Sequence, residues 1–144
     1  MKTGRIITQD ETIRDILNTS KTIAIVGLSP KPERDSNRVA GYLKDHGYRI
    51  IPIRPAQKEI LGEKAYSSLD DIKQPVDIVN VFRNSAQIIP HAYQAIRLKP
   101  KVFWMQLNIE NREAAELLTA AGIDVVMDRC IKVEHERLCN ENGL

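Results

Sequence analysis

Short apolar segments alternate with longer amphipathic segments along most of the chain. The apolar segments are rich in β-branched residues and have apolar side chains at successive positions, as in parallel strands covered on both faces. We predict strands at residues 22–26, 48–55, 76–82, 101–106 and 123–127. The amphipathic segments place apolar residues at helical spacing. We predict helices at residues 10–19, 37–46, 86–98, 112–121 and 131–138.

The order of these elements predicts the fold class. Alternating strands and helices form a parallel sheet whose crossover helices lie on both faces. We therefore expect an α/β fold that is Rossmann-like and doubly wound, with a mainly parallel five-stranded sheet. We expect residues 1–144 to form a single domain with a core at about residues 20–138.

Glycine or polar residues follow the end of each predicted strand. They are Gly27 and Ser29, Arg54, Arg83 and Ser85, Gln106 and Asn108, and Asp128 and Cys130. Open parallel sheets bind ligands beyond the carboxyl ends of their strands, where the strand order reverses. We therefore expect these residues to line one mouth and to form a ligand site there.

The loop after the first strand has the outline of a nucleotide-phosphate site. Gly27 can turn sharply and lets a ligand approach the backbone. We expect Ser36 to cap a helix that begins at Asn37, and free N–H groups at a helix start attract anions. Further side chains that can bind phosphate are Ser29, Lys31, Arg34 and Arg38. The alternative is an ordinary loop between a strand and a helix that binds no ligand.

Two features of the sequence bear on the kind of nucleotide. The G-x-G-x-x-G fingerprint of dinucleotide sites is incomplete, because only its first glycine, Gly27, is present. The second strand ends at Ile53 and Arg54, where NAD sites usually carry an acidic residue. An arginine there favours an extra phosphate on the ribose, as in NADP or coenzyme A (CoA). Arg54 does not choose between these two, and a solvated surface arginine is the simpler alternative.

Composition and charge exclude several classes of protein. Hydrophobic residues make up 42% and charged residues 28% of the chain, as in globular rather than disordered proteins. The net charge of +2 and the scattered cations give no footprint for nucleic acid. No apolar run approaches the roughly 20 residues of a membrane helix, and no apolar signal region follows the N-terminus. We therefore expect a cytoplasmic protein that binds neither nucleic acid nor membranes.

Motifs spread through the chain resemble those of the small single-domain CoA-binding proteins. The motifs are Gly27–Pro30, Ser36–Ala40, Ile50–Pro55, Glu59–Lys64, Val76–Arg83, Trp104–Leu107 and Val126–Arg137. These proteins in turn resemble the CoA-binding domain of the succinyl-CoA synthetase α subunit. The likeness covers residues 20–138, and the motif at Val126–Arg137 is its most specific part. The sequence departs from the family in having Arg54 before Pro55, where asparagine is common.

The resemblance implies that the mouth binds CoA or a short acyl-CoA. The residues implied around the diphosphate are Gly27, Leu28, Ser29, Lys31, Ser36, Asn37, Arg38 and Val39. Ile53 and Arg54 are implied at the adenosine and its ribose phosphate. Phe82, Arg83 and Ser85 are implied at the adenine or the pantetheine arm. Met105 and Gln106 are implied on the wall that leads to the thiol. The synthetase's phosphorylated histidine and nucleotide-grasp subunit have no counterpart in this sequence.

Cys130 follows the fifth strand at the same mouth, beside Arg129 and Lys132, and neighbouring cations favour a thiolate. One hypothesis is that Cys130 forms a reversible mixed disulfide with the thiol of CoA. The alternative is an inert, packed cysteine. Mass spectrometry of the oxidised protein with CoA distinguishes them, because only the first gives an adduct on the peptide that contains Cys130. Cys139 is the other cysteine, and the pair lacks the spacing of a disulfide framework or a metal site.

The sequence contains no recognisable catalytic motif of the metalloprotease, serine hydrolase or Walker type. We expect His46 and His91 to lie at the surface, and His135 to belong to a salt-bridged terminal helix rather than to act as an acid or base. We therefore expect a CoA-binding protein rather than an enzyme, with no catalytic apparatus evident, although the sequence does not decide whether a reaction is catalysed. Two alternatives stay open: an NADP-binding oxidoreductase or redox sensor, and a CoA-binding module that acts with a partner subunit. A homodimer is a further open possibility.

Overall fold

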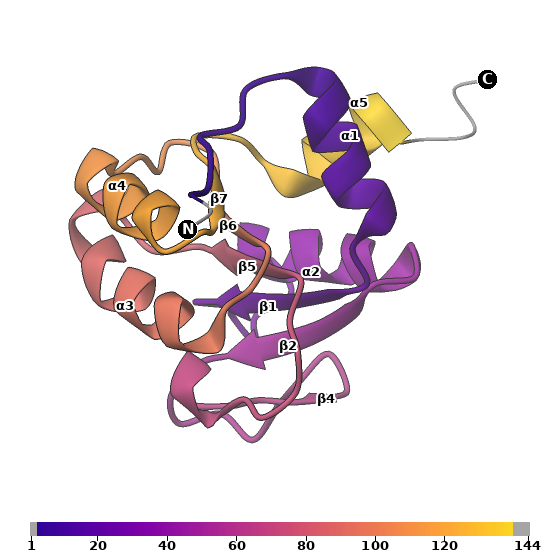
Figure 1. Cartoon of the computed structure of the whole chain (residues 1–144). Coiled ribbons are helices and arrows are strands. Elements are labelled where there is room, and N and C mark those ends of the chain that lie inside the picture. The colour runs from indigo at the N-terminus through magenta and orange to yellow at the C-terminus, as the bar shows by residue number, and fades with distance from the viewer. Residues whose placement is uncertain (1–2, 140–144) are drawn as a thin grey trace.

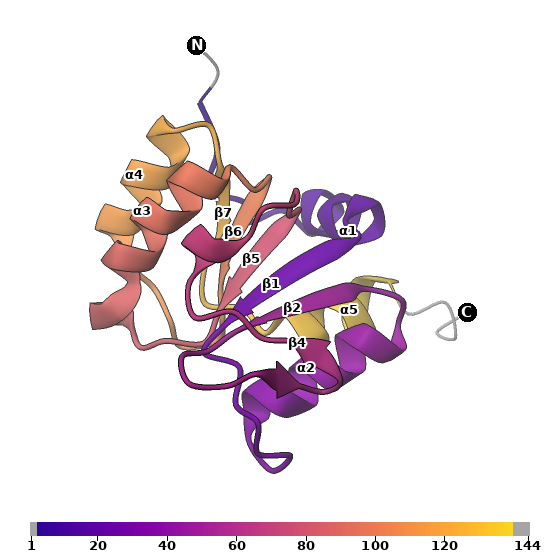
Figure 2. The ribbon, with the colours of Figure 1, turned by 90° about the horizontal axis from the view of Figure 1, so that it is seen from below.

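The computed structural model describes residues 3–139 and shows a five-stranded parallel sheet between two layers of helices (Figure 1, Figure 2). The strands of this sheet are β1 (Thr22–Val26), β2 (Arg49–Ile53), β5 (Ile78–Val81), β6 (Val102–Met105) and β7 (Asp124–Val126). The helices are α1 (Asp10–Thr19), α2 (Asp35–Asp45), α3 (Ile88–Leu98), α4 (Arg112–Ala120) and α5 (Ile131–Cys139). The predicted Rossmann-like α/β class is confirmed.

The strand order is β2-β1-β5-β6-β7, and all the pairs are parallel. The chain runs outward from β1 to β2 and then returns to the other side of β1, so the strand order reverses between β1 and β5. Val26 at the end of β1 is paired with Ile53 on one side and with Val81 on the other. The loops that begin at Gly27, Arg54 and Phe82 therefore leave the sheet side by side at the switch point, where such sheets bind ligands.

Side chains that alternate along each strand supply two separate cores. Ile23 and Ile25 of β1 pack with residues of α1, α2 and α5, while Ala24 and Val26 pack with residues of α3 and α4. Figure 2 shows the same division, with α3 and α4 on one side of the sheet and the other three helices opposite. Because both faces are covered, the strands are apolar at successive positions rather than alternating with polar residues.

The starts of two helices differ in how they are capped. Asn111 caps α4, because its side chain accepts the N–H of Ala114 at 2.9 Å. The predicted cap at Ser36 is wrong. Helix α2 begins at Asp35 after Arg34, whose side chain makes no capping bond. The Oγ of Ser36 instead accepts the N–H of Ser29 at 2.9 Å, because the loop folds back over the first turn of the helix.

Two short pieces of structure extend the sheet edges beyond the predicted strands. A small antiparallel hairpin of β3 (Glu59–Ile60) and β4 (Glu63–Lys64) lies next to β2, in a region where no strand was predicted. At the opposite edge, the N-terminal segment lies parallel to β7. The N–H of Ile7 donates to the carbonyl of Val125 at 2.8 Å, and the N–H of Val125 donates to the carbonyl of Arg5 at 2.9 Å.

The helices of the described part of the chain are short. Helices α2 and α3 contain 11 residues each, whereas a membrane-spanning helix needs roughly 20. Within residues 3–139, none has the length and apolar character to cross a bilayer. The cytoplasmic location expected from the sequence stays a prediction.

Candidate functional site

Three hollows adjoin one another at the carboxyl ends of β1, β2, β5 and β6. The loop hollow, of about 660 Å³, is lined by Gly27, Ser29, Pro30, Lys31, Glu33, Arg34, Asp35, Ser36, Arg54, Gln57 and Phe82. The central hollow, of about 430 Å³, is lined by Asp35, Arg38, Val39, Phe82, Arg83, Asn84, Gln106, Leu107, Asn108, Ile109, Cys130, Lys132 and Val133. The edge hollow, of about 290 Å³, is lined by Val26, Gly27, Ile53, Arg54, Pro55, Ser67, Ser68, Arg83, His91 and Gln94. The loop hollow shares Gly27 and Arg54 with the edge hollow and Phe82 with the central hollow, and Arg83 lines both the central and the edge hollows. The three therefore form one depression at the switch point.

Most of the residues predicted for the site line these hollows. Those that do are Gly27, Ser29, Lys31, Ser36, Arg38, Val39, Ile53, Arg54, Phe82, Arg83, Gln106 and Cys130. Leu28 and Met105 have no exposed surface, so their side chains support the walls from within. Asn37 is buried, and its Nδ2 donates to the carbonyl of Ser29 at 2.8 Å, which holds the loop.

Ser85 is the predicted site residue that the structure places away from the hollows. Its Oγ accepts the N–H of Glu110 at 3.0 Å, and its carbonyl accepts a bond from the side chain of Asn111 at 2.9 Å. These bonds join the turn before α3 to the start of α4. Ser85 therefore positions neighbouring elements rather than lining the depression.

The close approach of three loops requires glycine at position 27. Gly27 has a positive φ of 83°, and its N–H donates to the carbonyl of Ile53 at 3.0 Å. A Cβ atom added at this position would lie 2.8 Å from the carbonyl oxygen of Phe82. Both the positive φ of Gly27 and the carbonyl oxygen of Phe82, directly after β5, thus exclude a side chain at this position.

The loop between β1 and α2 is held by its own hydroxyl groups. The Ser36 Oγ accepts the N–H of Ser29, and the Ser29 Oγ accepts the N–H of Lys31 at 3.1 Å. Because α2 lacks a side-chain cap, N–H groups of its first turn remain available to an anion. The exposed carboxylate of Asp35 lies at the same helix start, and Arg38 pairs with it.

Several cations around the depression have no carboxylate partner. The ion pairs among residues 3–139 do not include Lys31, Arg34, Arg54 or Arg83. Lys31, Arg34 and Arg54 line the loop hollow, and Arg83 lines the two hollows beside it. Arg54 also reaches across the depression, where its Nη1 lies 3.5 Å from the carbonyl oxygen of Gly27. The charge of these groups is therefore available to a bound anion.

A buried polar chain below the central hollow was missed by the sequence analysis. Asn80 lies in the middle of β5 with no exposed surface, and its Nδ2 donates to the Oε1 of Gln106 at 3.1 Å. The same oxygen accepts the N–H of Ile131 at 3.2 Å. Because both bonds use the oxygen, the amide nitrogen of Gln106 remains available as a donor. The sequence feature from which this role could have been predicted is an asparagine within an otherwise apolar strand.

His91 and Asp128 are defined by their neighbours. His91 is half-buried rather than fully at the surface, lines the edge hollow and lies 3.3 Å from the Oε1 of Gln94. Burial lowers the pKa of His91, and nearby Arg83 lowers it further, against the hydrogen bond to Gln94. These contacts therefore favour the neutral imidazole. Asp128 accepts the N–H of Asn108 at 2.7 Å and joins two loops of the mouth.

Comparison with known proteins identifies the family of the chain. A family model described as a CoA binding domain matches residues 21–136. The uncharacterized protein YneT of Bacillus subtilis (strain 168) is 48% identical over 123 residues, which make up 85% of this chain and 91% of that protein. The solved structure of a hypothetical protein from Pyrococcus horikoshii OT3 has a TM-score of 0.88 and 44% identity, and the match covers 96% of this chain and 99% of that chain.

A third relative has a named activity. The ADP-forming acetate–CoA ligase of Methanocaldococcus jannaschii is 34% identical over 58 residues, which are 40% of this chain and 8% of the ligase. The matched family model, by contrast, spans most of this chain, from residue 21 to residue 136. The chain therefore belongs to the CoA-binding domain family.

Proposed function

We propose that the chain binds CoA or an acyl-CoA in the depression at the switch point. In this proposal the diphosphate lies in the loop hollow and the pantetheine arm follows the central hollow toward Cys130. The observation that carries the proposal is the group of unpaired cations around the uncapped start of α2. A diphosphate would be met there by Lys31 and Arg34 and by backbone N–H groups.

The residues of the depression fit the chemistry of CoA. The loop hollow offers cations and hydroxyl groups, which suit phosphates. The central hollow combines apolar walls from Val39, Phe82 and Ile109 with the free amide of Gln106, which suit an arm of methylene and amide groups. An adenosine bound near the end of β2 would place its ribose phosphate within reach of Arg54.

CoA explains these features better than NADP does. Both carry a ribose phosphate that Arg54 could bind, but the chain has only the first glycine of the dinucleotide fingerprint. Membership of the CoA-binding domain family also supports CoA. A partner subunit and a homodimer remain open alternatives from the sequence.

The role of Arg54 provides the test. Replacing Arg54 with alanine should weaken the binding of CoA more than that of dephospho-CoA, because only CoA carries the phosphate on the ribose. The expected difference is about 1.5 to 3 kcal/mol, or about 10- to 150-fold in Kd. Isothermal titration calorimetry with both ligands measures it.

Arg49 provides a matched control at the other end of the same strand, where it is exposed. Arg49→Ala should bind both ligands like the parent protein, and circular dichroism should show that both variants are folded. An equal loss of affinity for CoA and dephospho-CoA in Arg54→Ala would show that this arginine does not bind the ribose phosphate.

A further inference from the structure

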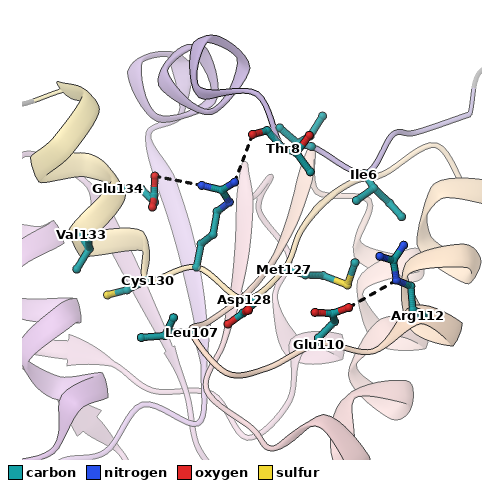
Figure 3. A pocket seen from close by; sticks show the side chains of 12 residues that line it. Ile6, Thr8, Leu107, Glu110, Arg112, Met127, Asp128, Cys130, Val133 and Glu134 are labelled. Atoms are coloured by element: carbon teal, nitrogen blue, oxygen red, sulfur yellow. Dashed lines mark hydrogen bonds and ion pairs between the residues drawn. The ribbon is translucent and has the colours of Figure 1, made fainter.

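A fourth hollow continues the central hollow past Cys130. This outer hollow, of about 390 Å³, lies between the N-terminal segment, the loop after β6 and the start of α5. Cys130, Leu107 and Val133 line both hollows, whereas Ile6 and Met127 line only the outer one. Figure 3 shows the three shared residues on one side of the outer hollow and Ile6 and Met127 on the other. A ligand that passes Cys130 therefore enters a separate space.

The exposed apolar side chains of the protein are concentrated around this space. Among the described residues, the large apolar side chains that are well exposed are Ile6, Tyr93, Leu107 and Val133. Three of these four line the outer hollow, and only Tyr93 of α3 lies elsewhere. Exposed apolar groups that gather around a concave surface mark a site for an apolar ligand.

The arginines of the outer hollow are already paired with carboxylates. Arg129 lies 3.6 Å from the carboxylate of Glu134 and donates to the carbonyl of Thr8 at 3.3 Å. Arg112 lies 3.6 Å from the carboxylate of Glu110. These contacts, drawn in Figure 3, leave no unpaired arginine of the kind found in the loop hollow. The outer hollow therefore offers apolar surface but no cation for a ligand carboxylate.

We propose that the outer hollow holds the apolar, uncharged acyl chain of an acyl-CoA. This inference rests on the proposed function, in which the pantetheine arm ends near Cys130. The thioester then lies where the central and outer hollows meet, and the acyl chain extends toward Ile6 and Met127. A dicarboxylic acyl group of the same length is disfavoured, because its terminal carboxylate would enter a hollow whose arginines are already paired.

Titration of the full chain with CoA and with acetyl-, butyryl-, hexanoyl- and succinyl-CoA tests the inference. Affinity should rise from acetyl to hexanoyl by about two- to fourfold for each methylene that enters the hollow. Succinyl-CoA should bind more weakly than butyryl-CoA, although the two acyl groups have the same number of carbons.

Two variants test the location. Ile6→Asp and Met127→Asp each place a charge in the outer hollow without altering a residue of the central one, so both should bind free CoA normally and lose the dependence on chain length. Tyr93→Asp changes an exposed apolar residue outside the hollow and should keep that dependence. Ile6 is 38% exposed, so its replacement is compatible with folding even if that of the half-buried Met127 is not.

The outcomes separate the two proposals. If CoA binds but longer acyl chains bind no more tightly, the inference is wrong and the proposed function stands. If the affinity of Ile6→Asp still rises with the length of the acyl chain, the acyl chain lies outside the outer hollow. If neither CoA nor any acyl-CoA binds, the proposed function fails and the inference fails with it.

Discussion

Position 27 is where a single residue type determines whether the mouth can form. The positive φ of Gly27 and the carbonyl of Phe82 at 2.8 Å from an added Cβ both oppose a side chain. Gly27→Ala should therefore lower the free energy of unfolding by about 1 to 3 kcal/mol, the cost of a strained backbone conformation. Urea denaturation measures this change.

Gly41 is the matched control for this substitution. It lies within α2, and an added Cβ would meet nothing within 4 Å. Gly41→Ala should raise the free energy of unfolding by about 0.5 to 1 kcal/mol, because alanine favours a helix interior. Equal effects of the two substitutions would show that the mouth does not need glycine at position 27.

At the scale of elements, α5 connects the depression to a cluster of aromatic side chains. Its first turns supply Lys132 and Val133 to the mouth, while His135 is buried and its Nδ1 lies 2.7 Å from the hydroxyl of Tyr42 on α2. The ring of His46 lies 5.3 Å from that of His135. The prediction that His135 belongs to a salt-bridged terminal helix is confirmed, because Glu134 and Arg137 of α5 make ion pairs with each other and with neighbouring segments.

This cluster predicts that stability depends on pH. Burial lowers the pKa of His135, and the charge of nearby His46 lowers it further, whereas Glu136 on the same helix opposes the shift. The tyrosines packed against it are Tyr42 and Tyr48. Between its ordinary pKa of 6.5 and its lower folded pKa, His135 is more protonated when the chain is unfolded. Its contribution to stability is thus complete above that range and is lost as the pH falls through it.

His135→Gln should make the stability less dependent on pH. The parent protein should lose free energy of unfolding between pH 7 and pH 5, with at most about 1.4 kcal/mol per pH unit from one histidine. The variant should lose less, although His91, whose pKa is also lowered by burial, still contributes. Urea denaturation at both pH values measures the slopes. Identical slopes in the two proteins would exclude His135 as a source of the effect.

The elements that the sequence predicted are those whose pattern is local. The five strands of the parallel sheet and the five helices recur close to their predicted positions, because both faces of each strand and one face of each helix must be apolar. The hairpin of β3 and β4 was missed, since its strands contain 2 residues each and show no periodicity. The pairing of the N-terminal segment with β7 depends on contacts between distant parts of the chain, which no local pattern records.

At the scale of the whole molecule, the mouth was predictable because the topology of parallel sheets fixes where strand ends meet. That rule predicted that Gly27, Arg54 and Arg83 would lie together, and all three line the edge hollow. It did not show which residues line the depression: Leu28 and Met105 are buried, and Ser85 bonds to the N–H of Glu110 before α4. The outer hollow was also missed, because it needs the N-terminal segment to lie beside the start of α5.

The most direct test of the account is a calorimetric titration of the reduced protein with CoA, dephospho-CoA, NAD and NADP side by side. The unpaired cations at the switch point and the apolar path toward Cys130 predict that CoA binds most tightly, followed by dephospho-CoA, with NAD and NADP weaker than CoA. Tighter binding of NADP than of CoA, or no binding of any of the four ligands, would contradict the account.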